Sequence, residues 1–526
     1  MALAAADTYV VVLALTDMMT GVGLGIDALQ RATPIISGFL LGYIAVLPLI
    51  GRLADLVARQ RILLVCLMVF VLGSAITAVA VELPVLVGGR VLQGVGGGGL
   101  VPATLALVAD LWPPGRRGTP LGVVGAVQEL GSVLGPVLGA LVLAVADWRA
   151  IFWLNAVAGL LLAGLVVVVG GRRPSRPRVL VSVVAVAAVV VGCLALAAPE
   201  RLVTDVTLGV PFVPFEGHTA RLLTPIGVVA LALAVVWGVL ALVGAWPVLS
   251  RADLPGAFLL GTALGCLVLT FAASDPEREV VGPWGYALLP VAVVTAAAYL
   301  WRHRVAAEPL VARDVVRGRA RAGLLVSLLV GVALVAVVVD VPVLARLTLT
   351  DSQTEAALVL VRFLVAVPVG ALVGGWALRR MPEGVVCVAG LAVAAVGLGA
   401  MSRWGDGSLE SPWATVVLVL VGLGVGATLA PVNNVALASA PDDAHGVASS
   451  LVVVARMVGM VVGLALLTAI GLHRYYLAVA DLPDQTDADA LLGAGLVQVQ
   501  TVFAGAAVAA GVAALVSVAL GLRRQH

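Results

Sequence analysis

Long runs of apolar residues recur along almost the whole chain, and short polar segments separate one run from the next. The runs are about 17 to 27 residues long, the length that an α-helix needs to cross the hydrocarbon core of a bilayer. A strand of a transmembrane barrel would need only about ten residues. We count about 16 such runs, so the sequence predicts an all-α polytopic membrane protein.

The composition excludes several other classes of protein. Hydrophobic residues make up 62% of the 526 and charged residues only 11%, whereas a soluble domain is about half apolar and about a quarter charged. The formal net charge of +2 gives no reason to expect a nucleic-acid partner. Four cysteines lie inside apolar runs, so we expect neither a disulfide framework nor a metal site. They are Cys66, Cys193, Cys266 and Cys387.

Arginine accounts for all 31 basic residues, and its distribution between alternate loops is uneven. With a cytoplasmic N-terminus, 20 arginines fall in cytoplasmic loops, eight in external loops and three inside apolar runs. Cytoplasmic loops of membrane proteins carry an excess of basic residues. The bias therefore predicts an even number of segments with both termini in the cytoplasm.

The first six and the last six runs share interruptions by glycine and proline. Three glycines in the pattern Gly-x-Gly-x-Gly precede a proline between Gly94 and Pro102, and again between Gly422 and Pro431. Paired halves with matching interruptions are typical of transporters, whose site lies between the halves. We therefore divide the chain into an N-terminal six-helix bundle (1–170), a linker region with four helices (171–321) and a C-terminal six-helix bundle (322–526).

Two regions between runs are longer than the other loops. The external loop at 199–224 alternates β-branched and polar residues, which favours a small hairpin or ordered loop. Residues 473–495 could extend the last two helices beyond the bilayer. For both regions the alternative is a solvated connector.

The stretch VQELGSVLGPVLG, residues 127–139, combines residues that are costly in an apolar helix. Gly131, Gly135 and Gly139 recur every four residues and share one face, which lets a neighbouring backbone come close. Pro136 removes a backbone hydrogen bond and predicts a bend. Glu129 lies about ten residues into the run, and hence roughly 15 Å deep, near the bilayer midplane.

A charged group at that depth must face protein or water. Burial favours the protonated carboxyl of Glu129 and a nearby arginine favours the carboxylate, so this group is suited to load and release a proton. Arg456 lies at a similar depth in the other half, shortly before Gly459 and Gly463. We expect an ion pair between Glu129 and Arg456 that protonation weakens. The alternative is a fixed pair that only holds helices together.

Three further charged residues lie inside apolar runs. Asp340 and Arg362 form a second candidate ion pair, with a purely structural pair within the C-terminal half as the alternative. Asp7 lies near the cytoplasmic end of the first run, judged by its position alone.

The loop after the second run has the spacing Gly51-x-x-x-Asp55-x-x-x-Arg59, which resembles the loop between helices 2 and 3 of the major facilitator superfamily. In this interpretation Asp55 is an ion-pair and helix-end partner that latches the cytoplasmic side in one state. Leu56 and Ala58 depart from the usual pattern, and the corresponding loop of the other half lacks the acid. The latch is therefore expected on one side only. Alternatively, the arginines of this loop only set the topology.

The pattern R-x-x-Q-G in the fourth run, formed by Arg90, Gln93 and Gly94, also resembles this superfamily. An intramembrane arginine must face protein or a wet cavity. The alternative is that Arg90 reaches outward to the external interface.

Residues 131–140, GSVLGPVLGA, resemble the motif of superfamily antiporters in the expected fifth helix. With DTYVVV, RVLQG, DWRAIFWLN and VVVARMVGMVVG they make the chain similar to the fourteen-helix drug:proton antiporter family, and most of all to its actinobacterial branch that exports triacylglyceride. The resemblance implies a major facilitator fold of two six-helix bundles plus linker helices, with 179–246 as an additional helical hairpin. It also implies a midplane position for Asp7, from which we expect the natural N-terminus to be longer.

The resemblance further implies proton-coupled export of lipid such as triacylglyceride across the bacterial plasma membrane. Glu129, Asp7 and Arg456 would couple transport to the proton gradient, without any other cofactor. An external lipid-carrier lipoprotein is the implied partner, and we expect a monomer. One alternative is a multidrug proton antiporter for amphiphilic compounds. Others are a membrane-embedded lipid-modifying enzyme and a transport-dead scaffold, although we find no catalytic motif in the chain.

Overall fold

The structure is a computed structural model that describes residues 1–24, 29–170, 179–215, 220–271, 285–350, 352–484 and 487–522. The described residues form α-helices, 3-10 turns and loops, and no strand. Fourteen of their helices are long and apolar enough to cross a membrane, which confirms the predicted all-α polytopic class. Helices α1 (Ala2–Gly21) and α7 (Val179–Ala197) correspond to the other two predicted runs, and neither is among those fourteen.

The N-terminal bundle consists of six helices. They are α1, α2 (Leu29–Leu56), α3 (Arg59–Val79), α4 (Leu83–Leu111), α5 (Gly118–Leu143) and α6 (Arg149–Val169). The glycine run of α4 is buried, and it explains how α2 and α3 pack so closely on both sides of this helix. A Cβ atom on Gly98 would lie 2.6 Å from the backbone oxygen of Tyr43 in α2, and one on Gly96 would lie 2.7 Å from that of Cys66 in α3.

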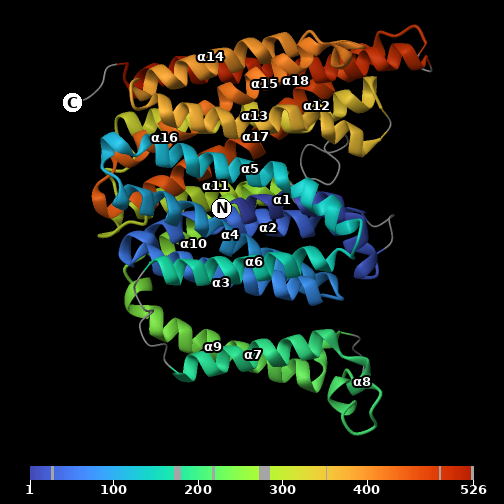
Figure 1. Cartoon of the computed structure of the whole chain (residues 1–526), viewed down its shortest axis with the longest axis vertical. Helices are drawn as coiled ribbons and strands as arrows, with labels where there is room; N and C mark the ends of the chain where they lie inside the picture. Colours follow the sequence, from blue (N-terminus) through green and yellow to red (C-terminus); the bar gives the residue numbers. More distant parts are fainter. Residues whose placement is uncertain are drawn as a thin grey trace.

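The linker region contains two pairs of helices with different surroundings. Helix α10 (Leu254–Phe271) packs against α11 (Gly285–Val305) and also against α2. Helices α7 and α9 (Pro225–Leu249) pair with each other and make only slight contact with α3 and α2, so they lie at one side of the bundle (Figure 1). This is the additional hairpin that the sequence predicts.

The loop that joins the two helices of that hairpin is ordered and contains no strand in its described part. It contains α8 (Glu200–Val203) and the 3-10 turns η3 (Val210–Phe212) and η4 (Arg221–Leu223), while residues 216–219 lie outside the described residues. The backbone amide of Arg221 donates to the carboxylate of Glu82. An ordered loop is therefore present, and the described residues do not form the alternative β-hairpin.

The C-terminal bundle repeats the arrangement of six segments. They are α12 (Arg319–Thr348), α13 (Gln353–Ala377), α14 (Glu383–Met401), the pair α15 (Pro412–Ala427) and α16 (Leu429–Ser439), α17 (His445–Ala480) and α18 (Ala488–Ser517). Helix α17 has 36 residues and is therefore about 54 Å long, well above the roughly 30 Å of a hydrocarbon core. This length agrees with the predicted extension of the last two helices beyond the bilayer.

The two halves meet mainly at one end of the molecule. We call it the arginine-rich end, because it holds the α2–α3, α4–α5 and α13–α14 connections. There α17 packs on α2, and α13 packs on α5. A Cβ atom on Gly51 would lie 2.6 Å from the backbone oxygen of Gly446, and one on Gly122 would lie 2.7 Å from that of Ala371. Such short separations show that the halves are closed against each other at this end.

Candidate transport site between the two halves

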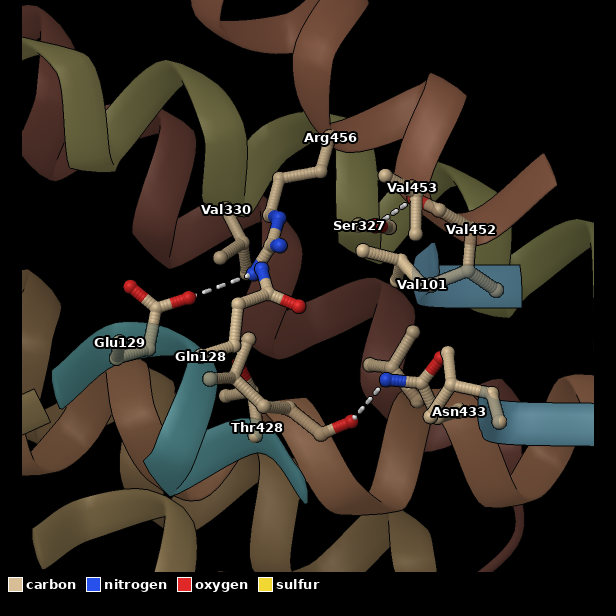
Figure 2. Close-up of a pocket in the computed structure, with 14 residues that line it drawn as sticks. Val101, Gln128, Glu129, Ser327, Val330, Thr428, Asn433, Val452, Val453 and Arg456 are labelled. Carbon is tan, nitrogen blue, oxygen red and sulfur yellow. Dashed lines mark hydrogen bonds and ion pairs between the residues drawn. The ribbon is translucent and has the colours of Figure 1, made fainter. Parts of the chain in front are cut away.

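Glu129 of α5 and Arg456 of α17 form an ion pair across the two halves. Nη1 of Arg456 lies 3.2 Å from Oε1 of Glu129, and the two side chains are 11% and 13% exposed. Both line a small pocket of about 30 Å³ whose walls come from α4, α5, α12, α16 and α17 (Figure 2). The structure thus brings together the acid and the base that the sequence placed at matching depths.

Glycine positions the backbone on which Arg456 stands. A Cβ atom on Gly331 of α12 would overlap the backbone oxygen of Arg456, and one on Gly463 would lie 2.8 Å from Cα of Val332. The hydroxyl of Ser327 also donates to the backbone oxygen of Val452 at 2.7 Å. Helices α12 and α17 are therefore held close together beside the pocket.

Asn433 is a polar residue of this pocket that our sequence reasoning missed. Its amide nitrogen donates to the backbone oxygen of Leu429 at 2.8 Å, while its Oδ1 is buried without a hydrogen-bond partner. At about 30 Å³, the pocket has room for about one or two water molecules. The adjacent pair Asn433-Asn434 in an otherwise apolar helix was the sequence signal that could have revealed it.

Asp7 and Arg90 form a second buried ion pair, inside the N-terminal bundle. Their side chains are 0% and 1% exposed. Asn155 donates to Oδ1 of Asp7 at 2.6 Å, and Arg90 donates to Oε1 of Gln93 at 2.8 Å. Arg90 also lies 4.6 Å from the ring centre of Phe39. Arg90 therefore faces protein, and the alternative that it reaches the external interface is wrong.

The partner of Asp7 also corrects its expected depth. The first residue of α4 lies at the end of the bundle opposite the arginine-rich end. Arg90 is only seven residues, or about 10 Å, from it. The position-based expectation that Asp7 lies near the end of the bundle expected to be cytoplasmic is therefore wrong, because the start of α1 packs at Ala2 against Gly131 in the middle of α5. Asn155 was missed, although an asparagine inside the apolar run of α6 was a visible signal.

Asp340 and Arg362 do not pair, contrary to our expectation. Nη1 of Arg362 donates to the hydroxyl of Thr415 at 3.0 Å, so this arginine reaches α15 and not α12. Asp340 is 5% exposed, and no hydrogen bond or ion pair is described for its carboxyl group. Sequence position fixes the depth of a residue in a helix but not the direction in which its side chain points, and the prediction failed on direction.

Gly51, Asp55 and Arg59 come together as the sequence predicts, at the arginine-rich end. Oδ1 of Asp55 accepts from the backbone amide of Gly446 at 2.6 Å, and Oδ2 accepts from that of Val447 at 2.9 Å. Arg59 lies 3.8 Å from Asp55. The carboxylate thus caps the first turn of α17, where its charge favours the helix dipole. This contact joins the two halves, so Asp55 is more than a topological charge.

Arg59 extends the same contact network to two further segments. Its guanidinium pairs with Asp110 at the end of α4, and Nη2 donates to the backbone oxygen of Asp442 at 3.4 Å. Arg59 therefore links α3, α4 and the turn before α17.

The glycine ridge of α5 packs against α1. A Cβ atom on Gly131 would lie 2.6 Å from Cα of Ala2, and one on Gly135 would lie 2.5 Å from the backbone oxygen of Ala6. Gly139 is also buried. Pro136 lies within a continuous α5, and the bend there stays a prediction. The ridge admits a neighbouring helix as the sequence indicates, and that neighbour carries Asp7.

Two helical bundles with an ion pair between them and a closed contact at one end are the arrangement of a membrane transporter. The Major Facilitator Superfamily profile matches residues 1–272 and 218–464, and the chain belongs to this family. The fold agrees with that of two solved structures. The proton:xylose symporter XylE matches with a TM-score of 0.55 and 14% identity, covering 98% of this chain and 92% of that one. The human organic anion transporter TETRAN matches with a TM-score of 0.52 and 16% identity, covering 98% and 96%.

Curated relatives with higher identity come from mycobacteria. The triacylglyceride transporter of Mycobacteroides abscessus is 35% identical over 488 residues, covering 90% of this chain and 81% of the relative. The triacylglyceride transporter of Mycolicibacterium hassiacum is 37% identical over 485 residues, covering 90% and 78%. The chain is thus a multi-pass membrane transporter whose relatives are named for a lipid substrate.

Proposed function

We propose that the protein is a proton-coupled antiporter that exports lipid such as triacylglyceride across the bacterial plasma membrane. The observation that carries the proposal is the Glu129–Arg456 ion pair, because it joins the two halves beside a pocket that is otherwise mostly apolar. The names of the relatives support a triacylglyceride substrate. The arginine bias supports cytoplasmic termini, and hence a cytoplasmic arginine-rich end.

Protonation of Glu129 removes its attraction to Arg456. Two unit charges 4 Å apart attract by about 4 kcal/mol at an effective dielectric constant of about 20, and such an energy shifts a two-state equilibrium by about a thousandfold. A proton taken up from outside would therefore favour opening of the arginine-rich end, where lipid enters and the proton leaves. Deprotonation restores the pair, and the protein returns to the closed arrangement with lipid released outside.

The Asp7–Arg90 pair supplies a second acid for coupling. It lies within one bundle, so its protonation would change the packing of α1 against α4 and α6 and not the contact between halves. We assign it an accessory role beside Glu129. Asp340 and Arg362 take no part in coupling in this proposal, because Arg362 bonds to Thr415 and not to Asp340.

Two finer points belong to the same proposal. We propose that the protein acts as a monomer without another cofactor and hands its substrate to an external lipid-carrier lipoprotein. Export of amphiphilic drugs is the second candidate, and the same apolar pocket lining favours it. The names of the relatives describe transport and no enzymatic reaction, which favours a transporter over a lipid-modifying enzyme.

The test uses proteoliposomes with an imposed pH gradient and either labelled triacylglyceride or ethidium. Glu129→Gln should abolish gradient-driven transport, because the amide cannot take up a proton. Asp17→Asn is the matched control, since Asp17 is an exposed acid of α1, and it should transport like the unaltered protein. Gradient-driven transport by Glu129→Gln at the normal rate would refute the coupling role. Movement of ethidium without triacylglyceride would refute the lipid substrate.

A further inference from the structure

A second and larger cavity lies at the arginine-rich end, between the two halves. Its volume is about 1060 Å³, and its walls come from the α4–α5 connection on one side and from α12, the α13–α14 connection and α16 on the other. It shares no lining residue with the pocket of Glu129 and Arg456. No residue to which the proposed transport cycle assigns a role lines it.

Positive charge predominates around this cavity. Among the described residues, Arg116, Arg319 and Arg379 line it, against one acidic residue, Glu383. Oε2 of Glu383 lies 3.0 Å from Nη2 of Arg319 and offsets the charge of that arginine. Arg379 donates to the hydroxyl of Thr119 at 3.0 Å and so bridges α13 and α5 across the halves. A ligand in this cavity therefore meets an excess of guanidinium groups, which favours an anion.

Asn434 adds a hydrogen-bond acceptor to the same cavity. Its amide nitrogen donates to Oε1 of Glu383 at 2.9 Å, which fixes the orientation of the amide. Its Oδ1 is buried and has no hydrogen-bond partner, and the residue is only 7% exposed. Buried polar atoms are nearly always paired. A ligand that carries a donor such as a hydroxyl in addition to its negative charge would satisfy this atom.

Apolar side chains form another part of the wall. Trp112, Val123 and Met381 line the cavity and are 39%, 45% and 50% exposed. Tryptophan is enriched at the level of lipid head groups, and these three residues lie near the ends of membrane helices. The cavity thus offers an apolar surface beside its charged one, as an amphipathic ligand requires.

We propose that this cavity binds an anionic membrane phospholipid whose head group carries a hydroxyl, such as phosphatidylglycerol. The arginines meet the phosphate, the hydroxyl donates to Oδ1 of Asn434, and the acyl chains lie along the apolar wall. Basic pockets between membrane helices on the cytoplasmic side hold such head groups in other proteins. Because the walls belong to both halves, the bound lipid links them and stabilises the closed arginine-rich end.

Native mass spectrometry of the full chain from nanodiscs of phosphatidylcholine doped with phosphatidylglycerol tests this proposal. The unaltered protein should retain phosphatidylglycerol. Arg116→Gln and Arg379→Gln should each weaken retention about fivefold, the effect of losing about 1 kcal/mol per arginine. Arg251→Gln is the matched control, because Arg251 is exposed in the α9–α10 connection and does not line the cavity. Equal retention by all three variants would overturn the proposal.

Two comparisons separate the chemical features of the ligand. Phosphatidylethanol has the same charge but no head-group hydroxyl. Asn434→Leu should therefore weaken the retention of phosphatidylglycerol and leave the retention of phosphatidylethanol unchanged. Equal loss of both lipids would refute the assigned role of Asn434. Free glycerol phosphate should displace the lipid only weakly, and full displacement at equal concentration would refute an acyl-chain contribution. No step requires transport, so failure here would leave the antiport proposal standing.

Discussion

Asp55 at the end of α2 accepts a hydrogen bond of 2.6 Å from the backbone amide of Gly446 at the start of α17. A second bond from Val447 occupies the other carboxylate oxygen, so one side chain of the N-terminal half satisfies two amides at a helix end of the other half. Those amides have no partner within their own helix. Asp55 thus ties the start of α17 to the end of α2 at the arginine-rich end.

Asp55→Asn should loosen this contact, because the amide side chain keeps one acceptor and loses the charge that favours the helix end. Loss of a hydrogen bond to a charged group costs about 1.5–3 kcal/mol. Ser450 is buried against Gly51, so a cysteine placed there in a background free of native cysteines reports opening. We expect faster labelling of Ser450→Cys by a soluble thiol reagent.

Asp443→Asn is the control for that measurement, since Asp443 is exposed in the turn before α17. Its labelling rate should equal that of the parent protein. An unchanged rate in Asp55→Asn would mean that the packing of α2 on α17 holds this end closed without the carboxylate.

Gly51→Val should open the same end by a different mechanism. Its Cβ atom would lie 2.6 Å from the backbone oxygen of Gly446, a separation that neither helix can accommodate without moving apart. Spin labels at exposed positions of the two halves, Arg61→Cys and Asp443→Cys, should report a longer distance. Gly164→Ala is a matched control because its Cβ meets open space. An unchanged distance in Gly51→Val would show that the helices adjust locally.

Sequence reasoning succeeded for charged side chains inside apolar runs, because burying such a charge without a partner is too costly. Glu129 and Arg456 lie inside apolar runs at similar depth, and a charge there needs a partner, so their pairing could be predicted. The four-residue spacing of Gly131 and Gly135 places both on one helix face, and this predicts a closely packed neighbouring helix. These inferences use only depth and periodicity, which the sequence contains directly.

Prediction failed where the direction of a side chain decides the contact. Asp340 and Arg362 had suitable charges, yet Arg362 reaches Thr415 in α15. Asn155 and Asn434 acquire their roles from helices far away in the sequence, and a single sequence does not reveal which faces of those helices meet. The cavity at the arginine-rich end was missed for this reason.

Asp7→Asn should strongly destabilise the N-terminal bundle. It leaves Arg90 buried without its counter-charge, and breaking a buried pair from one side costs about 3–5 kcal/mol. Thermal unfolding in detergent should therefore occur at a markedly lower temperature. The double variant Asp7→Asn with Arg90→Gln should recover part of the loss, because it removes the unpaired charge. No recovery would mean that the other hydrogen bonds of Arg90 outweigh its charge.

Asp340→Asn should leave stability unchanged or raise it, in contrast to Asp7→Asn. Asp340 is equally buried in α12, but no ion pair or hydrogen bond is described for its carboxyl group. A buried carboxylate without a partner is costly, and the amide removes the charge at nearly constant volume. The same thermal unfolding measurement compares the two variants directly. A loss of stability as large as that of Asp7→Asn would show that Asp340 has a partner in the membrane-embedded protein, such as a water molecule or a bound cation.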